Sequence, residues 1–204
     1  RFRLAIHLEP RSTAYRVELA RALASQGAAE EAQQQYEQAL AQQPNDPRVL
    51  EDLGQLYVQS GAADRAVPLL TKAVELRGDD PRLLAQLGTA LEKTGARGQA
   101  IQVLEQAVEK LPASATARAI LADVLYKDGR REDALEVVRT GLQAAPEAPP
   151  LHKSLGILYE RSGHAKDAAQ AYRDYIRLAP DAPDAKDLAE RANRLERRSA
   201  PPTS

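Results

Sequence analysis

Apolar and small residues recur along this chain with a fixed step of 34 residues. Five similar phrases, LARALASQG, LGQLYVQSG, LGTALEKTG, LADVLYKDG and LGILYERSG, begin at Leu19, Leu53, Leu87, Leu121 and Leu155. In each phrase the leucine, the small residue after it and the large residue four positions after it share one face of a helix. The final glycine suits the end of that helix, because a left-handed backbone costs other residues more. The pattern therefore predicts five amphipathic helices, each ending in a glycine turn.

A second helical pattern follows each glycine. After Gly27 it reads AAEEAQQQYEQAL, in which the small Ala32 and the bulky Tyr36 lie four positions apart on one face. In four of the five units a proline ends this second helix or lies just beyond it. Each unit thus predicts a helix, a tight turn and an antiparallel helix. Because one such hairpin cannot bury its apolar face alone, we expect the hairpins to stack.

These phrases, with the small and bulky positions of the second helix, resemble the tetratricopeptide repeat (TPR). The resemblance covers five full units, at 13–46, 47–80, 81–114, 115–148 and 149–182. It implies an all-α fold, a right-handed α-solenoid in which antiparallel helix hairpins stack into a superhelix. Residues 1–12 fit the end of a preceding repeat, so we expect at least one more repeat upstream.

The C-terminal flank carries an apolar stripe of Leu188, Ala192 and Leu195 surrounded by charged residues. This spacing predicts a capping helix over 183–198 that packs against the repeats on one side and is exposed to solvent on the other. The tail that follows, SAPPTS over 199–204, is expected to be disordered.

Several residues depart from the repeat pattern, among them the fourth residue of each unit, which is often a large aromatic in the family. Gly141 and Tyr175 stand where alanine is usual, Gly78 replaces a proline, and Pro68 falls well inside a second helix. A proline there removes one backbone hydrogen bond and bends the helix. We therefore expect irregular local geometry around Pro68 and Tyr175, with the assignment to the repeat unaffected.

The composition and charge of the chain exclude several classes of function. The chain is 43% hydrophobic and 28% charged, which is enough apolar material for a packed core. Its formal net charge of −1 lacks the basic field that nucleic-acid binding needs, so no nucleic acid is predicted as a partner. There is no cysteine, which excludes disulfides and thiolate metal sites. No run of 18 apolar residues occurs, so we predict no direct membrane insertion.

The sequence holds no recognisable catalytic constellation. Its three histidines, His7, His152 and His164, form no zinc motif, and there is no nucleophile elbow or phosphate-binding glycine loop. Carboxylates such as Glu30 and Glu31 open second helices, where acids favour the helix dipole. The tyrosines at core positions are interpreted as packing residues, at Tyr36, Tyr57, Tyr159 and Tyr172. We predict no enzyme, and no catalytic, cofactor-binding or metal-binding residue.

The resemblance implies that first helices line a concave groove through the second, fifth, ninth, twelfth and thirteenth positions of each repeat. These positions vary from unit to unit, which is typical of a surface that binds another protein, either a peptide segment or a folded domain. Tyr126 is the one large aromatic residue among them, and it is either a candidate hot spot or a residue that only covers neighbouring aliphatic side chains. The predicted partner-binding residues are Arg48, Glu51, Gln55, Arg82, Thr89, Lys93, Asp123, Tyr126, Lys127, Lys153 and Ile157.

Two binding modes known in the family do not match this chain. The carboxylate clamp for chaperone tails needs lysine and asparagine at groove positions that here carry Val17, Arg21, Glu51 and Gln55. The asparagine ladder of sugar-transferring relatives is also missing.

The interpretation that results is a non-enzymatic scaffold or adaptor whose groove binds a segment of a partner protein. The richness of the chain in alanine, arginine and glutamine favours a bacterial setting, such as a secretion, motility or cell-envelope assembly. Three alternatives stay open. A folded partner such as a small GTPase could dock at an edge of the array or at the loops near Arg97 and Arg130. The array could be the substrate-recruiting arm of a larger enzyme, or it could homo-oligomerise through stacked repeat ends.

Overall fold

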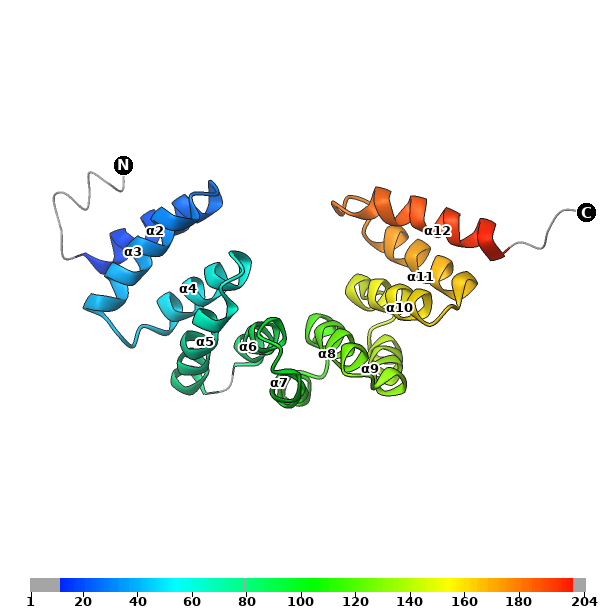
Figure 1. Cartoon of the computed structure of the whole chain (residues 1–204), viewed down its shortest axis with the longest axis horizontal. Coiled ribbons are helices and arrows are strands. Elements are labelled where there is room, and N and C mark those ends of the chain that lie inside the picture. The colour runs from blue at the N-terminus through cyan, green and yellow to red at the C-terminus, as the bar shows by residue number, and fades with distance from the viewer. Residues whose placement is uncertain (1–11, 79, 200–204) are drawn as a thin grey trace, which may run out of the picture. The chain divides into compact units, whose positions relative to one another are not determined.

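The protein is all-helical in the part of the chain that its computed structural model describes, residues 12–78 and 80–199. Eleven helices and no strand lie within those two ranges (Figure 1). The chain divides into two compact units, Arg1–Val103 and Leu104–Ser204. Each predicted repeat holds one pair of consecutive helices. Within the described ranges, no helix is both long enough and apolar enough to cross a membrane.

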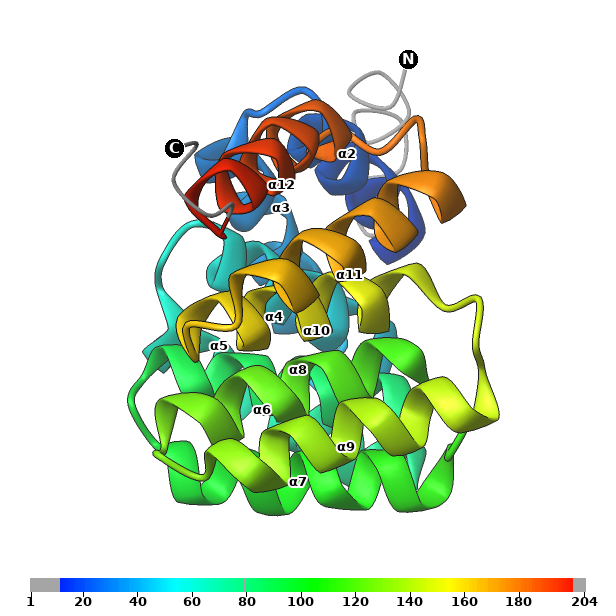
Figure 2. The same ribbon diagram turned by 90° about the vertical axis from the view of Figure 1, so that its right-hand side faces the viewer.

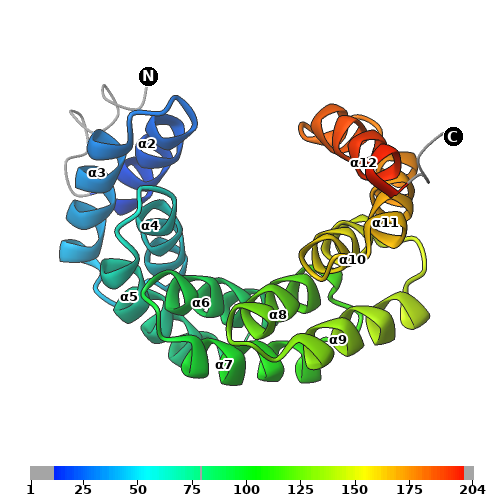
Figure 3. The ribbon, with the colours of Figure 1, turned by 45° about the vertical axis from the view of Figure 1, so that its right-hand side comes forward.

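Unit 1 contains five whole helices and the first half of a sixth. They are α2 (Thr13–Ser25), α3 (Ala29–Gln42), α4 (Pro47–Gln59), α5 (Ala63–Arg77), α6 (Pro81–Lys93) and the start of α7 (Arg97–Lys110). Each helix from α2 to α6 packs on the next, and α4 also contacts α2 and α6 (Figure 3). In this described part of unit 1, α3 and α5 make no such contact with each other. Neighbouring helices among α2, α4 and α6, called here the first-helix layer, therefore lie closer together than α3 and α5 do.

Unit 2 begins within α7 and continues to the end of the described chain. Its helices are α8 (Ala115–Lys127), α9 (Arg131–Ala144), α10 (Pro149–Arg161), α11 (Ala165–Leu178) and α12 (Ala185–Ser199). Helix α10 packs on α8, α9 and α11, and α11 packs on α12 (Figure 2). The predicted stripe of Leu188, Ala192 and Leu195 is buried in one cluster with Tyr172 and Tyr175.

The turns within the hairpins follow from the repeated glycines. Gly61, for example, has φ of 81°, and Gly27, Gly95, Gly129 and Gly163 have φ between 79° and 89°. The N–H of Ala62 then donates to the carbonyl of Tyr57 across 2.8 Å, so the chain reverses within the three residues that connect α4 to α5. The predicted glycine turns are confirmed.

Small residues inside the helices mark places where two helices approach closely. A β-carbon on Gly54 would lie 2.8 Å from Cγ of Leu70. At Gly141, where alanine is usual, a β-carbon would lie 2.7 Å from Cδ1 of Leu151 and 2.8 Å from Cδ of Arg118. This departure from the repeat pattern is therefore a packing requirement at the junction of α8, α9 and α10.

The other departures disturb the fold little. Helix α5 continues through Pro68, whose side chain is exposed. Tyr175 is buried, and its hydroxyl donates to Oδ1 of Asp184 across 2.6 Å, which fills the space that an alanine would leave. Helices α5 and α11 run unbroken through these two residues, and the bend expected at Pro68 stays a prediction.

Three of the four tyrosines predicted as core residues are buried. Tyr36, Tyr57 and Tyr172 are at most 3% exposed, whereas Tyr159 is only half-buried at the edge of the cluster beneath α12. The expected preceding repeat (1–12) falls, except for Ser12, outside the described residues. Of the expected disordered tail, Ser199 belongs to α12 and residues 200–204 also fall outside.

Candidate protein-binding surface

Two open clefts lie between α2 and α4 on the first-helix layer of unit 1. The larger, of about 450 Å³, lies at the N-terminal ends of the two helices, where Val17, Arg21 and Arg48 line it. The smaller, of about 260 Å³, lies toward their C-terminal ends and is lined by Arg21, Tyr36 and Gln55, among others. Two of the predicted partner-binding residues, Arg48 and Gln55, thus lie on one helix and line neighbouring clefts.

An ion pair separates the two clefts. Nε of Arg21 on α2 donates to Oδ2 of Asp52 on α4 across 2.8 Å, and Nη1 donates to Glu18 across 3.0 Å. The hydrogen bond to Asp52 raises the pKa of the Arg21 guanidinium, so this cation stays charged. Side chains this exposed form ion pairs worth about 0.2–1 kcal/mol, so a ligand could replace the pair at little cost.

Glu51, also on α4, holds helices together. Nη1 of Arg77 donates to one of its oxygens across 2.8 Å, and Nε2 of Gln86 donates to the other across 3.2 Å. The same guanidinium reaches Asp80, which caps α6 by accepting from the N–H of Arg82. Glu51 therefore has a packing role in the structure that the sequence pattern did not reveal.

The predicted residues on α6 differ in how available they are. The side chains of Arg82 and Lys93 are exposed. Thr89 is half-buried, and its hydroxyl donates to the carbonyl of Ala85 within the same helix. Arg82 and Lys93 are thus the predicted residues on α6 that a partner can reach most directly.

In unit 2, three predicted residues come together at the C-terminal end of α8. Asp123 forms ion pairs with Lys127 across 2.7 Å and with Arg161 of α10 across 3.0 Å. The half-buried ring of Tyr126 lies beside them, with the Arg161 guanidinium carbon 5.3 Å from its centroid. Arg131, at the start of α9, approaches the same ring to 5.6 Å.

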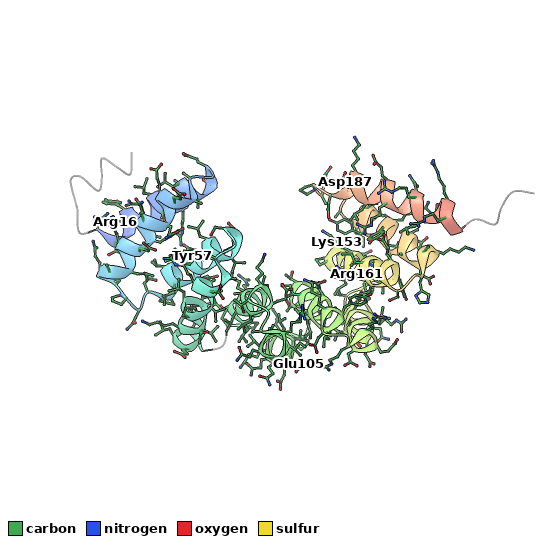
Figure 4. The ribbon with its side chains drawn as sticks, viewed as in Figure 1. Arg16, Tyr57, Glu105, Lys153, Arg161 and Asp187 are labelled. Carbon is green, nitrogen blue, oxygen red and sulfur yellow. The ribbon has the colours of Figure 1, made fainter. Side chains whose placement is uncertain are left out.

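The remaining predicted residues lie on α10. Lys153 pairs with Asp184 across 2.5 Å (Figure 4 labels Lys153 and Arg161 on this helix). This contact and the hydroxyl of Tyr175 lower the pKa of the Asp184 carboxyl. Ile157 is half-buried and packs against the core cluster beneath α12. Lys153 and Ile157 therefore contribute to the packing of α10, α11 and α12.

The predicted set of partner-binding residues lacks several residues that shape these surfaces, above all Arg21, Asp52, Arg131 and Arg161, although Arg21 and Arg161 stand at groove positions of their repeats. A signal for some of them is present in the sequence. Arg21 and Asp52 are 31 residues apart, and Glu160 and Arg191 form a second ion pair at the same separation. Opposite charges at this spacing connect first helices of successive repeats, so a search for such pairs could have found them. We know of no sequence signal for Arg131.

His152 makes a local contact with the backbone. Nε2 of His152 lies 2.7 Å from the carbonyl oxygen of Pro146. Arg118 makes the equivalent contact one repeat earlier, donating to the carbonyl of Pro112 across 2.9 Å. His152 thus takes a structural role that an arginine fills elsewhere. Between residues 12 and 199, leaving out 79, no group of three His, Cys, Asp or Glu side chains could hold a metal ion.

Comparison with known proteins identifies the repeat. A tetratricopeptide repeat model matches residues 4–147, and a second such model matches residues 121–183. No curated protein matches the chain in sequence.

Solved structures of similar proteins share the fold. TTC0263 of Thermus thermophilus, a thermophilic TPR protein, is 22% identical with a TM-score of 0.72, over 91% of this chain and 99% of its own. YrrB, a TPR protein with an unusual peptide-binding site, is 21% identical with a TM-score of 0.65, over 96% and 97%. MamA (41-end) from Desulfovibrio magneticus RS-1 is 24% identical with a TM-score of 0.68, over 84% and 97%.

Proposed function

Because the chain belongs to the tetratricopeptide repeat family and is a protein-interaction scaffold, we propose that the first-helix layer of unit 1 binds an extended or helical segment of a partner protein. The family consists in general of non-catalytic scaffolds, and we propose that this chain has no catalytic activity of its own. The alanine, arginine and glutamine richness supports an adaptor role in a bacterial multiprotein assembly.

The observation that carries this proposal is the pair of clefts between α2 and α4. Their lining combines small apolar side chains such as Ala14 and Val17 with the exposed polar groups of Arg48 and Gln55. Small apolar side chains beside a few polar groups suit a peptide, because the apolar contacts give affinity and the polar groups fix the register. YrrB, which shares the fold, is described as having a peptide-binding site, and this supports a segment as the ligand.

The same surface extends along α4 to α6. Arg82 stands one repeat after Arg48, and both are exposed at the second position of their repeats. A bound segment that follows the layer would pass both cations. We therefore assign the first contacts to Arg48, Gln55, Arg82 and Lys93, and a role in shaping the surface to Glu51 and Thr89.

In unit 2 we propose that Asp123, Tyr126 and Lys127 take part in partner binding, with Lys153 and Ile157 in support. These residues all lie on α8 and α10, the two first helices of that unit, which contact each other. Tyr126 has the partly exposed ring typical of a binding hot spot.

The test compares two variants that reverse the same number of charges. Arg48→Glu with Arg82→Glu alters the first-helix layer, and Arg97→Glu with Arg130→Glu alters the hairpin turns where a folded partner would dock. All four arginines are exposed, so both variants should fold, as circular dichroism would check. Proteins from a lysate of the source organism that bind each variant and the native chain would be quantified by mass spectrometry.

We expect at least one protein to bind the native chain and the turn variant, and to lose at least about tenfold in recovery with the layer variant. Equal recovery with both variants would contradict the proposal. Loss with the turn variant alone would favour the docking of a folded partner at the hairpin turns.

A further inference from the structure

We infer that Tyr126, Arg131 and Arg161, called here the basic–aromatic cluster, form a subsite for a carboxylate side chain of an acidic peptide segment. This inference rests on the proposed function, because the segment is taken to belong to the partner protein. It names a chemical preference that the family assignment does not supply.

The cluster is built from three helices of unit 2. Tyr126 lies in the last turn of α8, Arg131 begins α9, and Arg161 ends α10. The guanidinium carbons of the two arginines lie 5.6 Å and 5.3 Å from the centroid of the same ring. Both distances are within the range of a cation–π contact, so the tyrosine holds two cations near each other.

Near the Tyr126 ring the arginine and lysine cations outnumber the carboxylates that pair with them. Asp123 accepts from Nη1 of Arg161 and also pairs with Lys127, so one carboxylate serves two cations. Within the described chain the guanidinium of Arg131 forms no ion pair. Its neighbour Arg130 differs, because Nε of Arg130 donates to Asp133 across 2.6 Å. In the described chain Arg131 thus has no carboxylate partner. The nearby guanidinium of Arg161 shares the carboxylate of Asp123 with Lys127.

A carboxylate is the group that this arrangement fits. Guanidinium groups bind carboxylates through paired, charge-assisted hydrogen bonds, and the ring restricts the motion of both arginines before a ligand arrives. The ion pairs of Asp123 involve side chains that are 34–42% exposed, so they can rearrange at low cost. The net charge of the chain is −1, so attraction of an acidic segment must come from a local site of this kind.

A peptide fits better than a nucleic acid. Proteins that bind single-stranded nucleic acid stack successive bases on several aromatic rings along a basic groove. Here both arginines of the cluster approach the same single ring, that of Tyr126, and the chain as a whole is slightly acidic. An acidic peptide segment is therefore the occupant we assign.

The experiment uses neighbouring residues as a matched pair. Arg131→Gln and Arg130→Gln each remove one exposed positive charge from adjacent positions, but only Arg131 approaches the Tyr126 ring. The probes are a fluorescein-labelled glutamate-rich peptide, the same peptide with every glutamate replaced by glutamine, and a thymidine oligonucleotide of equal charge. Fluorescence polarisation would give the affinity of each probe for the native chain, the two single variants and Arg131→Gln with Arg161→Gln.

We expect the glutamate peptide to bind the native chain more tightly than the glutamine peptide, and less tightly as salt is added. Arg131→Gln with Arg161→Gln should weaken it by about tenfold or more, because charge-assisted hydrogen bonds are lost. Arg130→Gln should change the affinity by less than about twofold.

Three results would overturn the inference. They are equal binding of the glutamate and glutamine peptides, equal losses for Arg130→Gln and Arg131→Gln, and oligonucleotide binding as tight as that of the glutamate peptide. Any of these would leave the proposed function standing if the partner recovered from the lysate still depends on Arg48 and Arg82. If that dependence also fails, the proposed function fails separately.

Discussion

The ring of Tyr172 lies against the α-carbon of Gly156 so closely that a β-carbon there would be 2.6 Å from Cδ1 and Cε1. The ring cannot easily move away, because Tyr172 is completely buried and its hydroxyl donates to Glu160 across 2.7 Å. The close approach of α10 and α11 therefore depends on the glycine that follows the repeated leucine.

Gly156→Ala should lower the free energy of unfolding by about 1–3 kcal/mol, because the added methyl group overpacks this contact. Urea unfolding followed by circular dichroism would measure the change. The preceding repeat carries Ala122 and Val138 at the two corresponding positions, both fully buried. Accordingly, Gly156→Ala should cost less in a Tyr172→Val background than in the native chain. An equal cost in both backgrounds would show that the ring contact is not the cause.

Pro68→Ala should raise the free energy of unfolding, by up to about 3 kcal/mol. Pro68 lies in the middle of α5, where it removes a backbone hydrogen bond, and its exposed side chain contributes little packing. The comparison of urea midpoints for the variant and the native chain gives the change directly. A lower urea midpoint for the variant would contradict this expectation. It would mean that Pro68 stabilises the native helix although its side chain is exposed.

Gly61→Ala should destabilise the protein by about 1–2 kcal/mol, because its φ of 81° lies in the left-handed region. Gly98→Ala is the matched control, since Gly98 lies inside α7 and has open space where the methyl group would be added. It should be neutral or slightly stabilising. Thermal and urea unfolding of both variants would be compared, and equal losses of stability would contradict the assignment of a special backbone at Gly61.

Stability should fall at alkaline pH, between about pH 10 and pH 12. Burial, above all, raises the pKa of Tyr36 and of Tyr57 to about 12 from 10.0. The hydrogen bond to Asp184, together with burial, raises the pKa of Tyr175 to about 12. Because these hydroxyls ionise more easily in the unfolded chain, their contribution is complete below pH 10 and is lost as the pH rises through 12.

Urea midpoints measured from pH 8 to pH 12 would test this expectation, with Tyr175→Phe as the variant. Removal of the hydroxyl should make the midpoint less sensitive to pH in the upper part of this range. A native chain whose midpoint stays constant to pH 12 would show that the tyrosines ionise equally in the folded and unfolded states.

The sequence was sufficient to predict the fold because its signals are local and repeated. The five turn glycines and the leucines of the first helices each specify one feature within a single hairpin, and two consecutive helices lie within each 34-residue unit. Tyr159 is the exception among the predicted core tyrosines, because its place at the edge of the cluster beneath α12 depends on contacts with other helices.

The surface was harder to predict because side-chain pairing is not local. Glu51 and Lys153 occupy positions that face a partner in the repeat pattern, yet Arg77 and Asp184 bind them within the chain. The pair of Glu51 and Arg77 joins residues 26 positions apart, a separation that the repeat does not predict, whereas Lys153 and Asp184 have the 31-residue separation that a search of the sequence could have found.

Site-specific photocrosslinking tests the central claim most directly. A photoreactive residue would replace Gln55, which lines the smaller cleft between α2 and α4, or Gln34, which is exposed on the second helix α3. After irradiation in a lysate of the source organism, mass spectrometry would identify the crosslinked peptides. We predict that position 55 captures one recurrent segment of a partner protein and that position 34 does not. Capture of the same segment at position 34, or none at position 55 while the partner remains bound, would contradict binding on the first-helix layer.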